Sequence, residues 1–177
     1  LPSLCGISYT YFKKLFTVPS STTYAFDVSM SSEANRLAIS YFDIGMGMGR
    51  ISVAVYNLSG KEITNIIIDG EYVLTTGFIS ENVFAVVTDR AVHLYDKNFE
   101  EIDESYDYGG GTVTGYRVNE YGVAVSYTLN SQNTAIAFDK SGNMLYNENI
   151  SNNVKDVELY GEYIFLRTDF GIVRVNT

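Results

Sequence analysis

The chain has 177 residues and a net charge of −9, a balance that disfavours a nucleic acid or an acidic membrane surface as partner. Hydrophobic residues make up 46% of the chain, with 15 Tyr and 10 Phe, which predicts a folded core and favours β-structure over disorder. The single cysteine, Cys5, excludes an internal disulfide, and no apolar run is long enough to insert into a bilayer.

Residues 1–20 come first and hold two apolar stretches, Ile7–Phe12 and Leu15–Val18, on either side of Lys13 and Lys14. We expect one or two extra strands here. They would belong to an earlier repeat, or they would supply an outer strand that the last repeat lacks. Because the chain starts at Leu1 rather than at Met, we also expect upstream sequence to be missing.

Four units of similar length follow, at approximately residues 22–69, 70–108, 111–150 and 153–177. The first is predicted to contain the strands Tyr24–Met30, Arg36–Phe42, Arg50–Asn57 and Glu62–Ile68. The second is predicted to contain Tyr72–Phe78, Val83–Thr88, Ala91–Asp96 and Glu101–Tyr106. The third is predicted to contain Val113–Val118, Gly122–Thr128, Thr134–Asp139 and Met144–Glu148. The fourth is predicted to contain only Lys155–Tyr160, Tyr163–Thr168 and Gly171–Asn176, and therefore lacks an outer strand.

A recurring turn marks the end of the third strand in each unit. An apolar strand ends in Asn57, Asp96, Asp139 or Asn176, so the motif repeats roughly every 40 residues. Asn and Asp accept a hydrogen bond from the backbone two residues on, and a glycine three residues on takes the left-handed conformation easily. The second unit lacks this glycine, and there we expect Asn98 to be left-handed.

Short strands with regular turns indicate a β-sandwich or a β-propeller, and four strands in every unit favour the propeller. We therefore predict an all-β fold of about four antiparallel propeller blades. Residues 1–177 would form a single propeller domain or a segment of one. An immunoglobulin-like sandwich is the alternative, but it does not predict self-similarity at this period. Blade edges left open invite pairing with another chain, so self-association is possible.

The repeat resembles quinoprotein-like and WD-like propeller repeats, and more narrowly an uncharacterised family of bacterial membrane-anchored β-propellers, catalogued as a domain of unknown function. The resemblance rests on Ala25–Ser29, Asn35–Ser40, Arg50–Glu62, Val83–Val87 and Ala137–Gly142. It implies a longer parent chain with an N-terminal membrane anchor and an extracytoplasmic, cell-surface propeller. It offers no catalytic residues that could be assigned to this chain.

No catalytic, cofactor or metal site is predicted. The chain has no Trp, which argues against a quinone-cofactor dehydrogenase, whose blades dock through repeated tryptophans. The run Asp139-Lys140-Ser141-Gly142 imitates part of a sialidase-type turn, but a hairpin explains it better. His93 is the only histidine and lies in the middle of a predicted strand, where a structural role is expected. Calcium stabilisation is possible in principle, yet no calcium-loop motif is present.

The loops between the second and third strands of the units are the candidate binding face, because loops on one face of a repeat array usually bind the ligand. The glycine-rich segment Gly45–Gly49 is not a phosphate loop, since it lacks the Lys-Ser/Thr ending and no helix follows. The candidate residues in these loops are Asp43, Met46, Met48, Arg50, Asp89, Arg90, Asn130 and Asp169.

The leading functional hypothesis is a non-enzymatic propeller that acts as a binding or scaffold module for a protein or a glycan. The alternative is a carboxylate-dependent glycoside hydrolase or lyase. That chemistry needs two carboxyl groups at a defined separation. Acids on the innermost strands, Asp27, Asp156 and Glu158, are the candidates for it.

Overall fold

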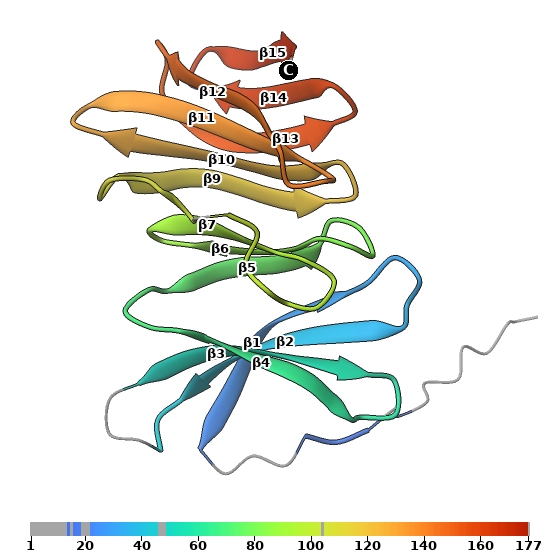
Figure 1. Cartoon of the computed structure of the whole chain (residues 1–177). Helices are drawn as coiled ribbons and strands as arrows, with labels where there is room; N and C mark the ends of the chain where they lie inside the picture. Colours follow the sequence, from blue (N-terminus) through green and yellow to red (C-terminus); the bar gives the residue numbers. More distant parts are fainter. Residues whose placement is uncertain (1–13, 15, 19–21, 46–48, 104, 177) are drawn as a thin grey trace, which may run out of the picture.

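The computed structural model describes residues 14, 16–18, 22–45, 49–103 and 105–176, and in these it contains only β-strands, turns and loops. The strands form four antiparallel sheets, in each of which only strands consecutive in the chain are paired. We call the sheets blades 1 to 4, and Figure 1 shows them following one another in a column from blade 1 to blade 4. The predicted all-β propeller blades are confirmed.

The strand boundaries agree closely with the predicted ones in three of the four blades. Blade 1 contains β1 (Thr23–Met30), β2 (Arg36–Asp43), β3 (Arg50–Asn57) and β4 (Glu62–Ile68). Blade 2 contains β5 (Val73–Phe78), β6 (Phe84–Thr88), β7 (Ala91–Tyr95) and β8 (Tyr106–Asp107). Blade 3 contains β9 (Thr112–Asn119), β10 (Gly122–Leu129), β11 (Gln132–Asp139) and β12 (Met144–Ile150). Blade 4 contains β13 (Val154–Tyr160), β14 (Tyr163–Thr168) and β15 (Gly171–Asn176), so within the described residues it has no outer strand.

The predicted outer strand of blade 2, Glu101–Tyr106, is wrong. On the edge of β7 that faces away from β6, only β8 and an isolated bridge between Tyr95 and Glu101 are paired in the described residues. Between these two contacts Asp103 adopts a left-handed backbone conformation, with φ of 54°. This conformation turns the chain away from the ladder, because a strand needs extended dihedrals at every residue.

Each sheet has two ends with different connections, because its strands run alternately up and down. The end that carries the turns between second and third strands also carries the connections from blade to blade, at residues 69–72, 108–111 and 151–153. We call it the crossover end. The opposite end carries the remaining turns, and we call it the hairpin end.

Three apolar cores lie between consecutive sheets. Val53 and Val55 of blade 1 share a core with Phe84 and Val86 of blade 2. Blades 2 and 3 share a second core, and blades 3 and 4 share a third. Blades 2 and 3 therefore bury both faces of their sheets, whereas blades 1 and 4 each bury one face against the rest of the column.

The recurring Asn/Asp turns lie at the hairpin end and have the predicted chemistry. The Oδ1 atom of Asn57 accepts the backbone N–H groups of Ser59 and Lys61, both at 3.0 Å. Asp96 and Asp139 accept the equivalent pairs of N–H groups at 2.8–2.9 Å. Gly60 and Gly142 have φ values of 82° and 89°, as expected for the left-handed position.

In the second turn, the left-handed residue is Phe99, with φ of 64°, and the expectation for Asn98 is wrong. Phe99 occupies the place of Gly60 and Gly142, three residues after the acid, so the geometry of the turn overrides the preference of Asn. The strain is opposed by packing, since the Phe99 ring lies 5.9 Å from the ring of Phe84 in an edge-to-face arrangement. The Arg36 guanidinium lies 6.0 Å from the same ring.

The described residues of the N-terminal segment, Lys14 and residues 16–18, are not in a strand, and they do not complete blade 4. The Phe16 ring packs 5.6 Å from the ring of Tyr56. This contact is part of a small apolar cluster with Tyr41 and Ala54, on the face of blade 1 that points away from blade 2. The other residues of the expected extra strands, among them Ile7–Phe12, lie outside the described residues.

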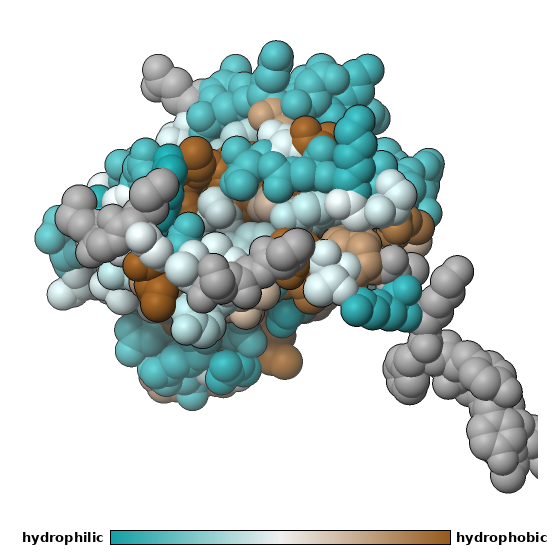
Figure 2. Space-filling view, turned by 90° about the horizontal axis from the view of Figure 1, so that it is seen from below, coloured by the Kyte–Doolittle hydropathy of each residue, from teal (hydrophilic) through white to brown (hydrophobic). Residues whose placement is uncertain are grey.

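The outer face of blade 1 remains partly apolar beyond this contact. Val28 and Met30 on β1 are exposed, and so is Ile67 on β4. Figure 2 looks at the molecule from the blade 1 end and shows apolar residues scattered among paler ones there. No helix long and apolar enough to cross a membrane occurs in the part of the chain that the structure describes.

The innermost strand of every blade carries a β-bulge at the same place. One residue is left out of the pairing in each of β1, β5, β9 and β13, and these residues are Phe26, Leu74, Thr114 and Lys155. A bulge bends its strand and increases the local twist. The repeat is therefore conserved in backbone geometry at positions where the four side chains have nothing in common.

Candidate binding face

The predicted binding-face residues that the structure describes lie at the crossover end, in or beside the turns between second and third strands. Met46 and Met48 lie outside the described residues. The structure brings Asp89 and Arg90 into one cavity, whereas Asp43 lines a separate one with Tyr41 and Glu62 on the outer face of blade 1. The six predicted residues that the structure describes therefore do not form a single site.

The remaining predicted residues have local structural roles. The Nε atom of Arg50 lies 3.9 Å from Asp69 in an exposed ion pair, which contributes little. Asn130 takes a left-handed conformation, with φ of 50°, in the β10–β11 turn. Asp169 accepts a hydrogen bond from the Asn153 amide and pairs with Lys155 at 3.1 Å. The Asn153 amide first, and then Lys155, lower the pKa of the Asp169 carboxyl.

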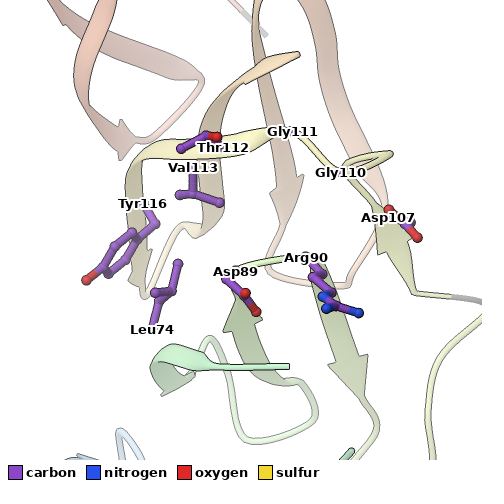
Figure 3. A pocket seen from close by; sticks show the side chains of 9 residues that line it. All are labelled: Leu74, Asp89, Arg90, Asp107, Gly110, Gly111, Thr112, Val113 and Tyr116. Carbon is purple, nitrogen blue, oxygen red and sulfur yellow. The ribbon is translucent and has the colours of Figure 1, made fainter. Parts of the chain in front are cut away.

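The cavity that contains Asp89 and Arg90 has a volume of about 640 Å³ and lies between blades 2 and 3. Figure 3 shows its lining side chains, with Tyr116, Leu74 and Val113 on one side and Arg90 and Asp107 on the other. Asp89 points into the space between these two groups, and Gly110, Gly111 and Thr112 complete the wall. Apolar, acidic, basic and hydroxyl groups therefore converge on one open groove.

The Asp89–Arg90 turn is held rigidly from three sides. The Thr88 hydroxyl accepts the N–H groups of Arg90 at 3.1 Å and Ala91 at 2.8 Å. The Arg90 carbonyl accepts the N–H of Tyr108 from the next connection, at 2.8 Å. Asp89 exchanges two hydrogen bonds with Tyr72, since its carboxylate accepts the Tyr72 N–H at 2.7 Å and its own N–H donates to the Tyr72 carbonyl at 2.9 Å.

The Arg90 side chain is free to bind a ligand. It is exposed, and within the described part of the chain its guanidinium has neither a hydrogen bond nor an ion pair. It also lines a second cavity of about 330 Å³ between blades 1 and 2, together with Glu71 and Tyr72. Arg90 therefore stands on the ridge between two neighbouring cavities.

His93 lies directly beneath this region and connects segments that are distant in the sequence. Its Nδ1 atom is 2.9 Å from Glu101 and its Nε2 atom is 3.0 Å from Glu71. Glu71 also accepts a hydrogen bond from the Thr88 hydroxyl at 2.5 Å. Burial, together with Glu101 and Glu71, raises the pKa of the neighbouring Tyr95 to about 12.

This histidine cluster has a positioning role. Thr88 is fully buried, so it cannot reach a substrate as a nucleophile. The cluster instead fixes the connection that carries Tyr72 and the turn that carries Arg90. In the part of the chain that the structure describes, no three His, Cys, Asp or Glu side chains could hold a metal ion together.

The inner-strand acids are engaged with neighbouring groups. Asp27 accepts the N–H and hydroxyl of Thr76, from blade 2, at 2.8 and 3.1 Å. Glu158 pairs with Arg117 of blade 3 at 2.8 Å and accepts the Asn119 amide at 2.9 Å. Asp156 lies 3.8 Å from Arg167. The first two acids therefore serve to join blades.

Sequence reasoning missed Tyr72, Asp107, Thr112 and Tyr116 as lining residues, because they lie outside the loops between second and third strands. One sequence signal was available. Three consecutive glycines, Gly109–Gly111, come just before β9, and such a run marks a connection with unusual backbone dihedrals. Gly109 and Gly110 have φ values of 64° and 82°.

The comparison with protein families gives one match. Residues 13–176 fit the model of a family of unknown function, DUF5711. The chain belongs to this family. The match covers nearly the whole chain, so all four blades of this DUF5711 member lie within it. No curated protein is similar enough in sequence to count as a relative.

Solved structures with a similar fold include a WD40 domain and a β-propeller domain. The computationally designed Ika4 protein has a TM-score of 0.62 and 12% identity, over 94% of this chain and 99% of that one. The Pan2 WD40 domain of Neurospora crassa has a TM-score of 0.58 and 10% identity, over 86% of this chain and 49% of that one. The Cps50 (Swd1) β-propeller domain of Myceliophteria thermophila has a TM-score of 0.51 and 14% identity, over 81% and 50%. The DUF5711 chain thus spans nearly all of Ika4 but about half of the other two, and the likeness shows the fold alone.

Proposed function

We propose that the protein is a non-catalytic binding module, and that its ligand lies on the crossover end over the Asp89–Arg90 turn. The observation that carries this proposal is the exposed Arg90 guanidinium, which has no partner among the described residues and stands between two cavities. Five hydrogen bonds fix this turn, so the base of the Arg90 side chain is preorganised while its guanidinium stays available for a partner from outside.

The rigid support of the groove strengthens the proposal. Thr88, Tyr72 and Tyr108 hold the backbone of the turn, and the histidine cluster holds the adjacent connection. Binding to such a site costs little ordering of the backbone, so the Arg90 side chain is the main group that the ligand must order. A protein or a glycan is the proposed ligand. Placement outside the cytoplasm, through an anchor elsewhere in a longer chain, is proposed from the resemblance alone.

The binding test uses two libraries, an array of oligosaccharides and a phage-displayed collection of linear peptides. Each is applied to the wild-type chain, to the double variant Arg90→Ala/Tyr116→Ala, and to the control Lys140→Ala at the hairpin end. We expect a ligand that binds the wild type to bind the control with the same affinity. Its affinity for the double variant should be lower by a factor of about ten or more. Equal binding to all three proteins would place the ligand elsewhere and contradict the proposal.

The hydrolase or lyase alternative has a separate test. Chromogenic glycosides and soluble polysaccharides are incubated with the wild-type chain, with Asp27→Asn and with Glu158→Gln. The proposal predicts no turnover, since both carboxylates are occupied in joining blades. If the wild type turns over a substrate and either substitution abolishes this turnover, the protein is an enzyme and the proposal of a non-catalytic module is contradicted.

A further inference from the structure

The two cavities at the crossover end lie on either side of Arg90, and we call them together the path across blades 1 to 3. Arg90 lines both of them, so it stands at the middle of the path. Tyr72 lines the cavity between blades 1 and 2 and is 66% exposed, whereas Tyr116 lines the cavity between blades 2 and 3 and is 38% exposed. A ligand of several units can therefore meet one tyrosine ring in each cavity and the guanidinium between them.

The charge along this path argues against an anionic ligand. Three carboxylates line it, those of Glu71, Asp89 and Asp107, against the single cation of Arg90. The chain as a whole carries a net charge of −9. Like charges this close would repel a phosphate, a sulfate or an acidic sugar. The path instead offers many hydrogen-bond acceptors, which suit a ligand rich in uncharged donor groups.

The backbone at this end argues against an extended peptide. Peptides that bind by strand addition need an open row of N–H and C=O groups. Here the ends of the turn are already bonded, since Asp89 and Tyr72 bond each other and the Arg90 carbonyl accepts Tyr108. Besides the tyrosines, the partly exposed apolar lining consists of Leu74 and Val113 in one cavity and Phe42 in the other, where Ile51 and Ile68 are buried, and this is less than an anchored side chain requires. Recognition must then come mainly from side chains.

From these observations we infer that the ligand is a neutral oligosaccharide, which lies from Tyr72 across Arg90 to Tyr116. Its sugar rings pack on the faces of the two tyrosines, where C–H groups meet the negative face of the aromatic ring. Its hydroxyl groups donate to Asp89 and Asp107 and accept from Arg90 and Thr112. This inference rests on the proposed function, because it names the ligand class of the same site.

The test is calorimetric titration of the wild-type chain with neutral hexose and N-acetylhexosamine oligosaccharides, from disaccharides to hexasaccharides. We expect affinity to rise with chain length until both cavities are filled. Tyr72→Ala and Tyr116→Ala should each weaken binding of the longest active sugar about tenfold. Tyr116→Phe should keep most of the affinity, because it keeps the ring. Tyr160→Ala, at a tyrosine of the hairpin end about as exposed as Tyr72, is the matched control and should bind as the wild type does.

Salt dependence separates the possible outcomes. Binding of a neutral sugar should change less than about twofold when the salt is raised from about 0.05 M to 0.5 M, because no ion pair is screened. If Tyr72→Ala and Tyr116→Ala bind the sugar with the affinity of the wild type, the inference is overturned. If no neutral sugar binds up to millimolar concentrations while a peptide from the displayed library binds at Arg90, the proposed function stands and the glycan inference fails. If neither class binds, both fail.

Discussion

The junction between blades 1 and 2 and the junction between blades 3 and 4 both have polar links between innermost strands, but they differ in how closely the sheets approach. At the first, bulky residues such as Phe78 and Phe84 fill the core, and polar side chains such as Asp27 connect the innermost strands. At the second, three alanines, at 124, 135 and 137, face the large side chains of blade 4. Gly115 on β9 also lies so close to β13 that a Cβ atom there would be 2.7 Å from the Asp156 backbone.

This difference shows that one repeat can be docked in two ways. Small residues let neighbouring innermost strands approach until backbone meets backbone, and dispersion contacts then dominate. Larger residues hold the strands apart, and hydrogen bonds from side chains cross the gap. The junction between blades 3 and 4 should be the more sensitive to added volume, and the junction between blades 1 and 2 the more sensitive to lost hydrogen bonds and to pH.

The largest expected effect is at Gly115. Gly115→Ala places a methyl group against the backbone of Asp156, which cannot rotate away as a side chain can. We expect a loss of about 3 kcal/mol in the free energy of unfolding. Thr75 follows the same bulge in β5, so Thr75→Ala is the matched control and should cost less than about 1 kcal/mol. Urea denaturation followed by circular dichroism measures both, and equal losses would show that the close approach is unimportant.

The next effect is at Asp27. Asp27→Ala removes the acceptor for the N–H and the hydroxyl of the buried residue Thr76. The hydroxyl keeps the Ser29 hydroxyl as a partner at 3.3 Å, but the N–H is left without one, which costs about 2 kcal/mol. Asp27→Asn keeps a carbonyl oxygen in place and should lose less than half as much. The same denaturation experiment distinguishes the two variants. If both unfold like the wild type, the junction does not depend on the hydrogen bond between Asp27 and Thr76.

The smallest effect concerns the response to acid at the hairpin end of the same junction. The backbone N–H of Glu33 first, and then Ser32 and Arg36, lower the pKa of the Glu81 carboxyl. Since its folded pKa lies below that of the unfolded chain, its stabilisation is present at neutral pH and is lost as the pH falls through the lowered pKa. Glu81→Gln does not ionise and therefore lacks this pH-dependent stabilisation.

The midpoint of thermal unfolding, measured from neutral pH down to about pH 3, tests this expectation. The unfolding midpoints of the wild type and of Glu81→Gln should converge as the pH falls. The variant is slightly less stable at neutral pH, and its midpoint falls by less. The partly exposed position of Glu81 keeps the difference at neutral pH below about 1 kcal/mol. A constant gap between the two proteins at every pH would mean that the Glu81 charge does not contribute.

Local sequence signals were sufficient for most strands and for the turns at Asn57 and Asp139, because pairing and turn chemistry there depend on neighbouring residues. They failed at Phe99, whose left-handed backbone is stabilised by Phe84 on another strand and Arg36 in another blade. Local signals failed also after Glu101, where the left-handed backbone of Asp103 interrupts the pairing with β7 until β8. Self-association through the open edge of β15 stays a prediction.

The candidate site was only half predictable for a similar reason. Asp89 and Arg90 stand in a loop of the expected kind, so the repeat alone pointed to them. Tyr72 and Tyr116 join them only through the docking of three blades. The partners of His93, which lie 22 and 8 residues away along the chain, likewise have no local signal.

The pairing of consecutive strands, described above for every sheet, has a consequence for how the chain folds. All the strand contacts inside a blade close short loops, so they form quickly and with little loss of chain entropy. Folding should therefore begin within single blades, most readily in blade 3, where the two-residue turn of Asn130 and Ser131 closes eight consecutive residue pairs between β10 and β11. It should then spread to neighbouring blades as sheet faces dock, in the manner of a one-dimensional array.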